Sequence, residues 1–327
     1  MQIQEVLALI DKLNAKLVVL LCHQNADPDS LGAAFAFDGL LKRLRPTLQT
    51  EIAAPSGPSK LSKAIMNVLP IDLTHEPQIE KADLIVLLDI NTIQQLEKWN
   101  SRIKSECPLI IIDHHAKHPE TEKIATISIT DETASSTCII VYRLFKEKKI
   151  IPSRDEAKAL FLGIAYDTRH FILANSETLK IVADLTDLGV DAQETLTILS
   201  LPMDFSERIA RLKAANRVKI LRIKDWLIAL AHINAFQASG ARALISLGAH
   251  LAIVAGKKGD EIQVSFRASN EFYKGTDIHM GRDLATPLGN FLGGMGGGHS
   301  VSAGANGKGD VNSCFQFCEK LLRKKLY

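Results

Sequence analysis

The sequence lacks the features that would place a protein in or across a membrane. Its 327 residues contain no apolar run long enough to span a bilayer. The N-terminus has neither the basic start nor the small-residue cleavage site of a signal peptide. The five cysteines are unevenly spaced, which does not indicate a disulfide framework. We therefore expect a cytoplasmic protein with no membrane segment.

The chain also lacks a strong excess of either charge, since its formal net charge is +2. This value hides an asymmetry, because residues 219–327 hold 14 Lys and Arg against 8 Asp and Glu, and residues 1–218 hold 25 against 29. So small a basic excess does not indicate binding of long duplexes. It is typical of a domain that binds a short anionic substrate.

The order of apolar patterns predicts an α/β fold with two domains. Strands are expected at 16–22, 51–54, 84–88 and 109–112, between helices at 2–15, 30–44, 59–69 and 92–104. Continuous Leu, Ile and Val runs between helices indicate a doubly wound, mainly parallel sheet with both faces covered. We assign this sheet to a catalytic domain at 1–190.

A helical pattern over 176–218 predicts a connector at 191–217, followed by a smaller α/β domain at 218–327. Its expected strands are 218–223, 227–232, 251–255 and 262–267, and its expected helices are 235–247, 280–292 and 311–325. Residues 256–260 (GKKGD) predict a hairpin turn, and residues 293–299 a glycine-rich loop.

Residues 23–30 (HQNADPDS) are the most informative stretch, because they place His23, Asp27 and Asp29 directly after a buried strand. Three potential ligands within seven residues repel one another and lose hydration unless a cation compensates them. The alternative is an N-cap for the next helix, which needs only one such residue.

Further potential ligands follow the next strands of the predicted sheet. Asp89 follows one strand, and Asp113, His114 and His115 follow another. Asp167 ends a helix, where a carboxylate opposes the helix dipole unless a cation or hydrogen-bond donor lies nearby; a solvated Asp is the alternative. Four carboxylates and two or three imidazoles are too many for one ion and suit two ions that share an Asp. Such oxygen-rich sets favour manganese or magnesium.

The glycine-rich stretch GGMGGGH at 293–299 predicts an anion site, because closely spaced glycines let several backbone N–H groups approach one anion. A flexible linker is the alternative. Arg267, at the end of a predicted strand, is either a bidentate phosphate ligand or a solvated side chain. Cys314 and Cys318 lie one helical turn apart, which favours packing in a core over half of a metal site.

Taken together, these segments resemble the four successive motifs of the DHH phosphoesterase superfamily. The matching residues are His23–Gly32, Asp89, Asp113–His115 and Asp167–Thr168. Val264–Arg267 and Gly296–His299 resemble the substrate-binding motifs of the first type of DHH-associated C-terminal domain. The resemblance covers essentially the whole chain. It implies a hydrolase with a dinuclear, usually manganese, centre in a cleft between two domains.

The resemblance also implies a role for each candidate residue. One ion is assigned His23 and Asp27, the other Asp29, His114 and Asp167, and Asp89 bridges the two. His115 is expected to contact the scissile phosphate, with Asp113 supporting the histidines. The substrate's far phosphate is assigned to Arg267, Gly297, Gly298 and His299. Arg169 stands where the family's fourth motif often has glycine, which leaves the preferred substrate length open.

Within the superfamily, the compact chain resembles the nanoRNases and small exonucleases. This implies manganese-dependent, two-metal hydrolysis of short single-stranded RNA or DNA from one end. One alternative is a phosphatase or phosphodiesterase for 3′-phosphoadenosine 5′-phosphate or cyclic dinucleotides. A non-catalytic nucleic-acid-binding scaffold is less favoured, and the Gly-Gly-Gly-His motif argues against the pyrophosphatase branch. The sequence leaves open the cleavage polarity, a homodimer and a DNA-repair or replication partner.

Overall fold

The computed structural model describes residues 2–103, 106–200 and 203–327, which form two compact units. The first unit spans residues 1–201 and the second spans 202–327. The predicted connector, 191–217, contains one helix from each unit: α8 (Ala192–Ile198) and α9 (Phe205–Asn216). Residues 201–202 of that range lie outside the described part. In that part, no helix has the length and apolar character that a bilayer crossing needs.

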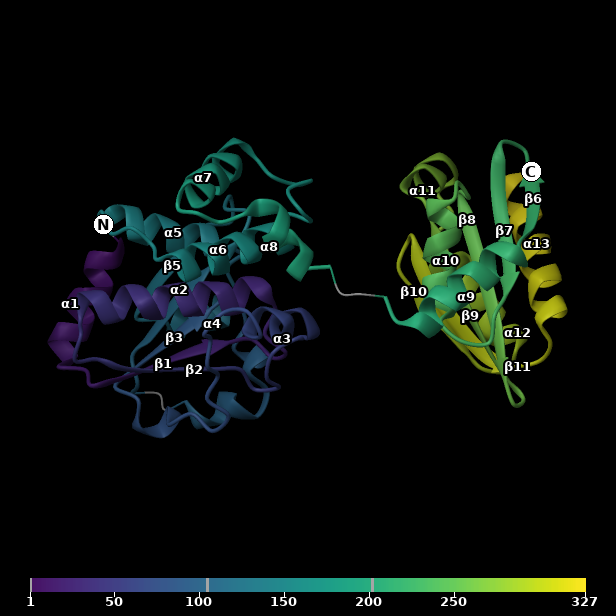
Figure 1. Cartoon of the computed structure of the whole chain (residues 1–327). Helices are drawn as coiled ribbons and strands as arrows, with labels where there is room; N and C mark the ends of the chain where they lie inside the picture. The colour runs from purple at the N-terminus through teal and green to yellow at the C-terminus, as the bar shows by residue number, and fades with distance from the viewer. Residues whose placement is uncertain (1, 104–105, 201–202) are drawn as a thin grey trace. The chain divides into compact units, whose positions relative to one another are not determined.

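A five-stranded parallel sheet forms the centre of the first unit, in the order β2-β1-β3-β4-β5 (Figure 1). All four pairings are parallel, so all five strands end at the same edge. The strands are β1 (Leu17–Cys22), β2 (Gln49–Ala53), β3 (Leu84–Leu88), β4 (Leu109–Asp113) and β5 (Ile127–Thr130).

Alternate side chains of these strands enter two separate cores, as a doubly wound sheet requires. Val18 and Leu20 face the helices α1, α2, α5 and α6, whereas Val19 and Leu21 face the other side with Trp99. The helices are α1 (Gln2–Leu13), α2 (Pro28–Leu44), α3 (Lys60–Met66), α4 (Pro119–Ile124), α5 (Thr137–Glu147), α6 (Arg154–Asp167) and α7 (Ser176–Asp187), with a short 3-10 turn η1 (Ile79–Lys81).

The predicted helix at 92–104 is wrong in type. The chain forms a 3-10 segment, η2 (Ile93–Arg102), interrupted at Glu97, whose φ is 48°; Lys104 lies outside the described residues. Its polar run QQLEKWN carries few apolar side chains, and burying Leu96 and Trp99 needs only short turns. The strand β5 was not predicted, because its four residues ISIT make no long apolar run, and the helix α5 was also missed.

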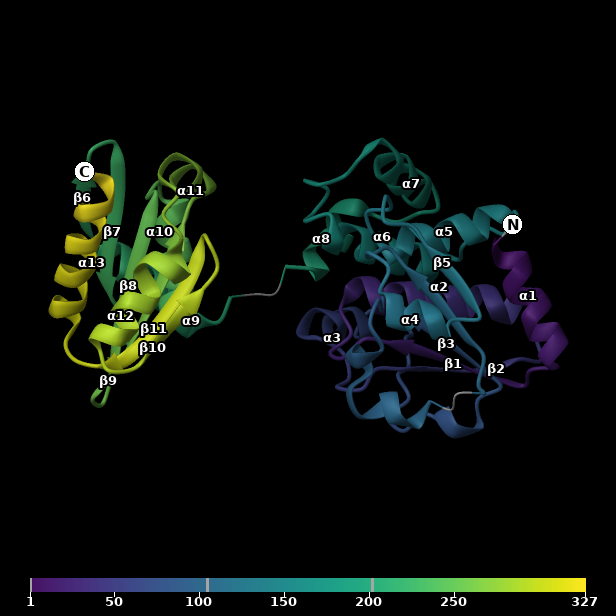
Figure 2. The same ribbon diagram turned by 180° about the vertical axis from the view of Figure 1, so that it is seen from behind.

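The second unit is a six-stranded mixed sheet in the order β10-β11-β9-β8-β7-β6. Its helices α9 and α10 pack on one face, whereas α12 and α13 lie on the other (Figure 2). The strands are β6 (Lys219–Ile223), β7 (Trp226–His232), β8 (Leu251–Lys258), β9 (Glu261–Ala268), β10 (Met295–Gly298) and β11 (Ser302–Lys308). The helices besides α9 are α10 (Gln237–Ser246), α11 (Asn270–Thr276), the π-helical turn η3 (Met280–Ala285), α12 (Thr286–Phe291) and α13 (Val311–Leu326).

Two turn predictions in this unit need correction. The glycine-rich stretch is not all loop, because Met295–Gly298 forms the edge strand β10, paired antiparallel to β11. A Cβ at Gly296 would collide with the carbonyl of Ala285, so this glycine lets η3 and α12 pack directly on the strand. The predicted turn at 256–260 is shorter, since β8 runs through Lys258 and the reversal uses Gly259 and Asp260. Cys314 and Cys318 are fully buried in the core under α13, as expected.

Candidate metal centre

Three neighbouring strands deliver imidazole and carboxylate groups to one edge of the first sheet. Because β1, β3 and β4 are adjacent and parallel, the residues that follow them meet at that edge. These residues are His23, Asp89 and the His114–His115 pair. Asp89 has a φ of 62°, a left-handed conformation that few non-glycine residues adopt. Such a backbone held directly after a strand is typical of functional sites.

The first turn of α2 supplies two more carboxylates. Asp27 is the N-cap of α2, and its Oδ1 accepts hydrogen bonds from the backbone N–H groups of Asp29 and Ser30, both at 3.0 Å. Asp27 is therefore the N-cap that the alternative interpretation required, and the same side chain is also a candidate metal ligand. Asp29 is fully buried and accepts from the backbone N–H groups of Thr137, at 2.7 Å, and Cys138, at 3.0 Å, in the first turn of α5.

Close packing of α2 on α6 brings Asp167 to the same place. A Cβ at Gly32 would lie 2.6 Å from the Ala159 carbonyl oxygen, and one at Gly163 would lie 2.9 Å from Asp29 Oδ1. Glycine at both positions therefore lets the two helices approach each other closely. Asp167 is the last residue of α6, and its carboxylate lies among the side chains from the strand ends.

The ligand atoms form one group around His23 and a second around His114. His23 Nε2 lies 3.5 Å from Asp27 Oδ1 and 3.6 Å from Asp89 Oδ2. The second group joins Asp29, His114 and Asp167, with His114 Nε2 3.0 Å from Asp167 Oδ2. Within each group the ligand atoms lie within 4.8 Å of one another.

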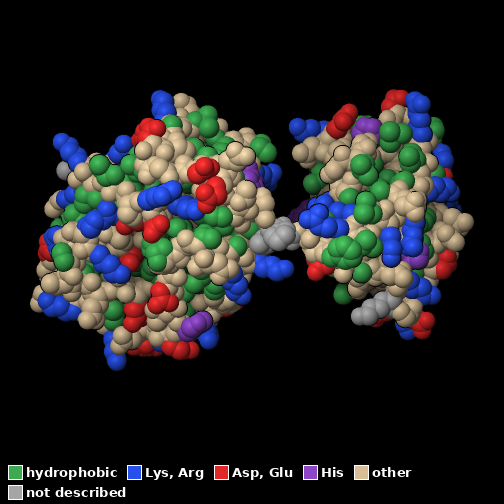
Figure 3. Space-filling model, viewed as in Figure 1, with side chains coloured by type: hydrophobic (Ala, Val, Ile, Leu, Met, Phe, Trp, Pro, Cys, Tyr) green, Lys and Arg blue, Asp and Glu red, His purple; other side chains and the backbone are tan. Residues whose placement is uncertain are grey.

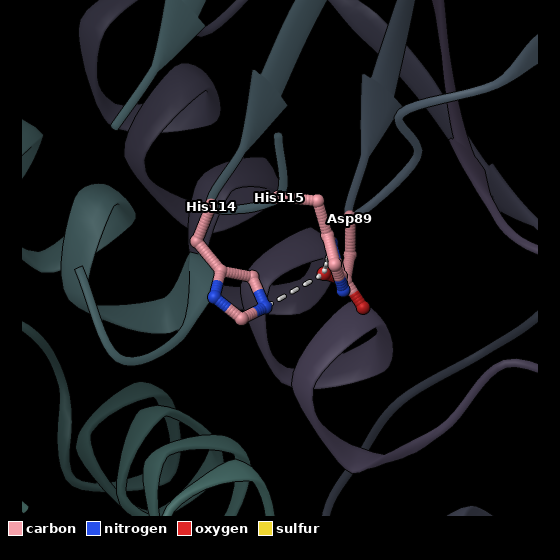
Figure 4. A group of neighbouring side chains, drawn as sticks. All are labelled: Asp89, His114 and His115. Atoms are coloured by element: carbon pink, nitrogen blue, oxygen red, sulfur yellow. Dashed lines mark ion pairs between the residues drawn. The ribbon is translucent and has the colours of Figure 1, made fainter. Parts of the chain in front are cut away.

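Asp89 lies between the two groups. Its Oδ2 faces His23, and its Oδ1 lies 3.6 Å from His114 Nε2 (Figure 4). His115 also approaches it, with Nδ1 3.5 Å from Asp89 Oδ1. The structure thus brings together all six residues that the sequence assigned to metal ions, in the same two sets and with Asp89 at the boundary. Their roles as ligands remain predictions.

The crowded charges raise the pKa values of two of the carboxyl groups and of both histidines. Burial, with the nearby carboxylates, raises the pKa of Asp29 and of Asp89 to about 7. For His23 burial works the other way, but the Asp27 and Asp89 carboxylates outweigh it and raise the pKa to about 9. For His114 the Asp167, Asp29 and Asp89 carboxylates do the same, also to about 9. The cluster holds protons tightly when no cation is present.

The donor set fits a divalent cation. His114 Nε2 is buried and makes no well-directed hydrogen bond, although Asp167 Oδ2 is only 3.0 Å away. A buried nitrogen and a carboxylate oxygen that face each other need a proton or a metal ion between them. The Nδ1 atoms of His23 and His114 face the carbonyls of Gln24 and Ala134, which leaves both Nε2 atoms toward the carboxylates. Carboxylates with a minority of imidazoles suit manganese or magnesium.

His115 and Asp113 form a supported pair at the rim of the cluster. His115 Nδ1 lies 2.8 Å from Asp113 Oδ1, and the backbone N–H of His115 donates to the same oxygen. Asp113 is 1% exposed, whereas the His115 side chain is 47% exposed. The Asp113 hydrogen bond raises the pKa of His115. Because Asp113 contacts Nδ1 of His115, the other ring nitrogen, Nε2, points away from Asp113.

Sequence reasoning missed Thr137, which holds two of the carboxylates. Besides its backbone contact to Asp29, its hydroxyl donates to Asp89 Oδ1 at 2.9 Å. Thr137 follows Ser136, the N-cap of α5. The signal in the sequence was the polar run ASST at 134–137 before an apolar helix, which is typical of a helix start.

The residues predicted to bind the substrate lie in the second unit. A pocket of about 590 Å³ is lined by Arg267, Gly297 and Gly298. Gly297, Gly304 and Ser265 lie in one cross-strand row and form its floor, and a Cβ at Gly297 would meet no atom within 4 Å. His299 is exposed and is not among the lining residues. Burial, with the charge of Arg242, lowers the pKa of Arg267, so a bound anion would be favoured here.

Metal binding to the first unit should displace protons. Because His23 and His114 hold protons up to a pH of about 9, a cation must replace these protons below that pH. We expect manganese affinity to rise with pH and to level off above pH 9, with about one proton released per histidine at pH 7.5. Calorimetric titration in two buffers of different ionisation enthalpy measures this number. His114→Gln should lower it by about one, and proton release unchanged by that substitution would contradict the assignment.

Comparisons with known proteins place this chain among relatives of a known family. A sequence model described as the DHH family, N-terminal domain, matches residues 17–164. The uncharacterized protein MJ0988 of Methanocaldococcus jannaschii is 37% identical over 322 residues, which is 97% of this chain and 94% of that protein. A probable manganese-dependent inorganic pyrophosphatase of Streptococcus equi is 29% identical over 181 residues, covering 53% of this chain and 56% of that enzyme.

A solved structure supports the fold along the chain. The crystal structure of an exopolyphosphatase-related protein from Bacteroides fragilis matches with a TM-score of 0.67 at 19% identity. The match covers 99% of this chain and 96% of that one. It confirms the predicted α/β architecture; the predicted active-site cleft between the domains stays a prediction.

Proposed function

The chain belongs to the DHH family, and from this premise we propose that it is a metal-dependent phosphodiesterase that removes nucleotides from an end of short single-stranded RNA or DNA. The family and the manganese-dependent pyrophosphatase relative support a metal-dependent hydrolase of phosphoric esters. The oligonucleotide substrate, the use of two ions and the preference for manganese are parts of the proposal.

The observation that carries the proposal is the position of Asp89 between two ligand groups. Each group offers nitrogen and oxygen atoms within 4.8 Å of one another, and Asp89 is 3% exposed, with one oxygen toward each. A single ion would leave at least two of the surrounding carboxylates uncompensated in a buried site. When bound, a pair of divalent cations activates water and neutralises the charge that develops on the phosphate.

Residues of this chain supply the remaining chemistry. His115 is half exposed, and Asp113 fixes its ring through Nδ1, so Nε2 can donate a hydrogen bond to a phosphate oxygen. The Asp113 hydrogen bond raises the pKa of His115, which favours the protonated imidazole and so the stabilisation of the developing negative charge. Thr137 holds the buried carboxylates in place, and this fixed geometry reduces the reorganisation needed on substrate binding.

The pocket at Arg267 supports an anionic substrate that is longer than inorganic phosphate. No ion pair in the described part of the chain engages Arg267 or Arg242, and Arg267 Nη1 donates only to the Phe266 carbonyl, at 2.8 Å. The floor of this pocket exposes backbone rather than side chains, since two of its three residues, Gly297 and Gly304, are glycines. A second phosphate of the same substrate would satisfy both features.

A time course on end-labelled oligonucleotides tests the proposal. With manganese present, RNA and DNA oligomers of two to twelve nucleotides, labelled at the 5′ end, should shorten from one end and yield mononucleotides. The same enzyme receives 3′-phosphoadenosine 5′-phosphate, a cyclic dinucleotide and inorganic pyrophosphate in parallel reactions. Turnover of one of these three without oligonucleotide cleavage would replace the proposed substrate, and no turnover of any phosphate compound would reject the proposed function.

A further inference from the structure

A second pocket in the C-terminal unit lies outside the site described above. Its volume is about 430 Å³, which suits a nucleotide. One wall is a single stripe of α9, because residues four apart lie on the same side of a helix. The other wall is the connection from β7 to α10, residues 233–236. The α9 lining residues include Phe205, Ile209, Lys213 and, at the helix end, Arg217.

Two aromatic side chains at this pocket are exposed to solvent. Phe205 is 77% exposed and Phe236 is 41% exposed. Neither ring belongs to an aromatic pair in the described part of the chain, whereas other rings, such as Trp226 with Phe272, do. Phe236 has φ 59° and ψ 36°, an unfavourable backbone for a bulky residue. Exposed aromatic residues at a pocket, here with one on a strained backbone, are typical of a binding function rather than of a core.

The charges at this pocket favour an anion. Residues 204–224 hold seven Lys and Arg against two Asp and Glu. Arg211 pairs with Glu207 at 3.5 Å, but no ion pair among the described residues engages Lys213 or Arg217. On the face of this unit that carries α9, Lys and Arg side chains lie among hydrophobic ones (Figure 3). Cations that have no acidic partner, beside exposed rings, are the chemistry of single-stranded nucleic-acid binding.

The two pockets of this unit are neighbours along the chain. Phe236 lines the second pocket, and the next two residues, Gln237 and Ala238, line the pocket of Arg267 and Gly297. The start of α10 therefore lies between the two pockets. An extended strand with one phosphate at Arg267 can continue past Gln237 without leaving the surface of the unit.

We propose that the pocket between α9 and the β7–α10 connection binds the nucleotides that extend beyond the Arg267 pocket in a single-stranded substrate. A base packs against Phe205 and Phe236, and its phosphate lies at Lys213 and Arg217. This site makes affinity increase with substrate length and leaves dinucleotide cleavage unaffected. It rests on the proposed function, because that function supplies the single-stranded substrate.

Binding and kinetics on two double variants test this site. Phe205→Ala/Phe236→Asn removes the rings, and Asn suits the left-handed backbone at 236. Lys213→Glu/Arg217→Glu reverses the charges. With fluorescent RNA and DNA hexanucleotides in EDTA, both variants should bind at least about fivefold more weakly than the wild type. The charge variant should also lower the dependence of log affinity on log salt by about 0.7, the loss of one neutralised phosphate. With manganese, KM for hexanucleotides should rise while dinucleotide kinetics stay unchanged.

The matched control is Lys320→Glu/Lys324→Glu, which makes the same charge change on α13, across the sheet from α9. This variant should bind hexanucleotides nearly as well as the wild type. Equal weakening by the control, or wild-type hexanucleotide affinity in both test variants, would overturn the proposed site. The EDTA measurement needs no turnover, so it gives a result on this site even if the proposed function fails. A difference in affinity between the RNA and DNA hexanucleotides identifies which nucleic acid this site prefers.

Discussion

Asp89→Asn should abolish turnover and leave the fold intact. Asp89 lies between the two ligand groups, with one oxygen toward His23 and the other toward His114, so its loss affects both of them. Asn keeps the size of Asp, and its carbonyl oxygen can still accept the hydrogen bond from Thr137. It lacks the charge and the second oxygen that a bridging ligand needs. We expect kcat to fall by about a thousandfold or more, measured with manganese on the substrate that the time course identifies.

For the same variant we also predict the stability of the metal-free fold, which should not fall although turnover is lost. Burial and the carboxylates of Asp29 and Asp27 raise the pKa of Asp89 to about 7 in the metal-free fold. The unfolded chain ionises this group near pH 4, so the free energy of unfolding of the metal-free wild type falls as pH rises from about 4 to about 7. Asn does not ionise. Thermal unfolding at pH 8 in EDTA should therefore show Asp89→Asn to be at least as stable as the wild type.

Together these results separate a catalytic role from a structural one. Asp187→Asn, an exposed Asp in α7 of the same unit, is the matched control and should change neither kcat nor the melting temperature. Near-normal kcat in Asp89→Asn would contradict the shared two-group site. A large loss of metal-free stability would show that the carboxylate supports the fold.

The sequence was sufficient to predict the edge of the first sheet, for a simple physical reason. Continuous apolar strands between helices must be parallel and buried, and parallel strands end on the same side. His23, Asp89 and His114 each come directly after such a strand, so their meeting follows from the strand order alone. Their division into two sets came from the family resemblance, and the distances in the structure agree with that division.

Features that depend on packing between segments far apart in the sequence could not be predicted in the same way. Thr137 contacts Asp29 across 108 residues of sequence, and nothing local to either residue indicates it. The glycines of β10 indicated an anion site by their density, but Gly296 and Gly298 also serve close packing: a Cβ at Gly296 would collide with the Ala285 carbonyl, and one at Gly298 with Ser302 and Ala303 of β11. All three glycines line the pocket, but of the three only Gly297, which alternates to the other face of the strand, has open space where a Cβ would lie. Strand alternation separates these two uses, and it became visible only when β10 was placed in the sheet.

Gly163→Ala should lower both the stability of the fold and the affinity for manganese, because it crowds Asp29 from the side of α6. Gly163 lies inside α6, where alanine would ordinarily favour the helix. Here the added Cβ would collide with the Cys138 sulfur and lie 2.9 Å from Asp29 Oδ1. Both neighbours are fully buried, so neither can move into solvent. We expect the free energy of unfolding to fall by about 1–3 kcal/mol, measured by urea denaturation, with weaker manganese binding measured by calorimetry.

A double-mutant cycle with Cys138→Ala divides this effect between its two causes. Removing the sulfur relieves the collision with Cys138, so Cys138→Ala/Gly163→Ala should recover part of the stability lost in Gly163→Ala. It does not relieve the contact with Asp29, whose Cα would also lie 3.0 Å from the new methyl group. Manganese affinity should therefore stay low in the double variant, whereas Cys138→Ala alone should bind manganese normally. Full recovery of affinity in the double variant would mean that Gly163 acts through packing on Cys138 and not through the position of the Asp29 carboxylate.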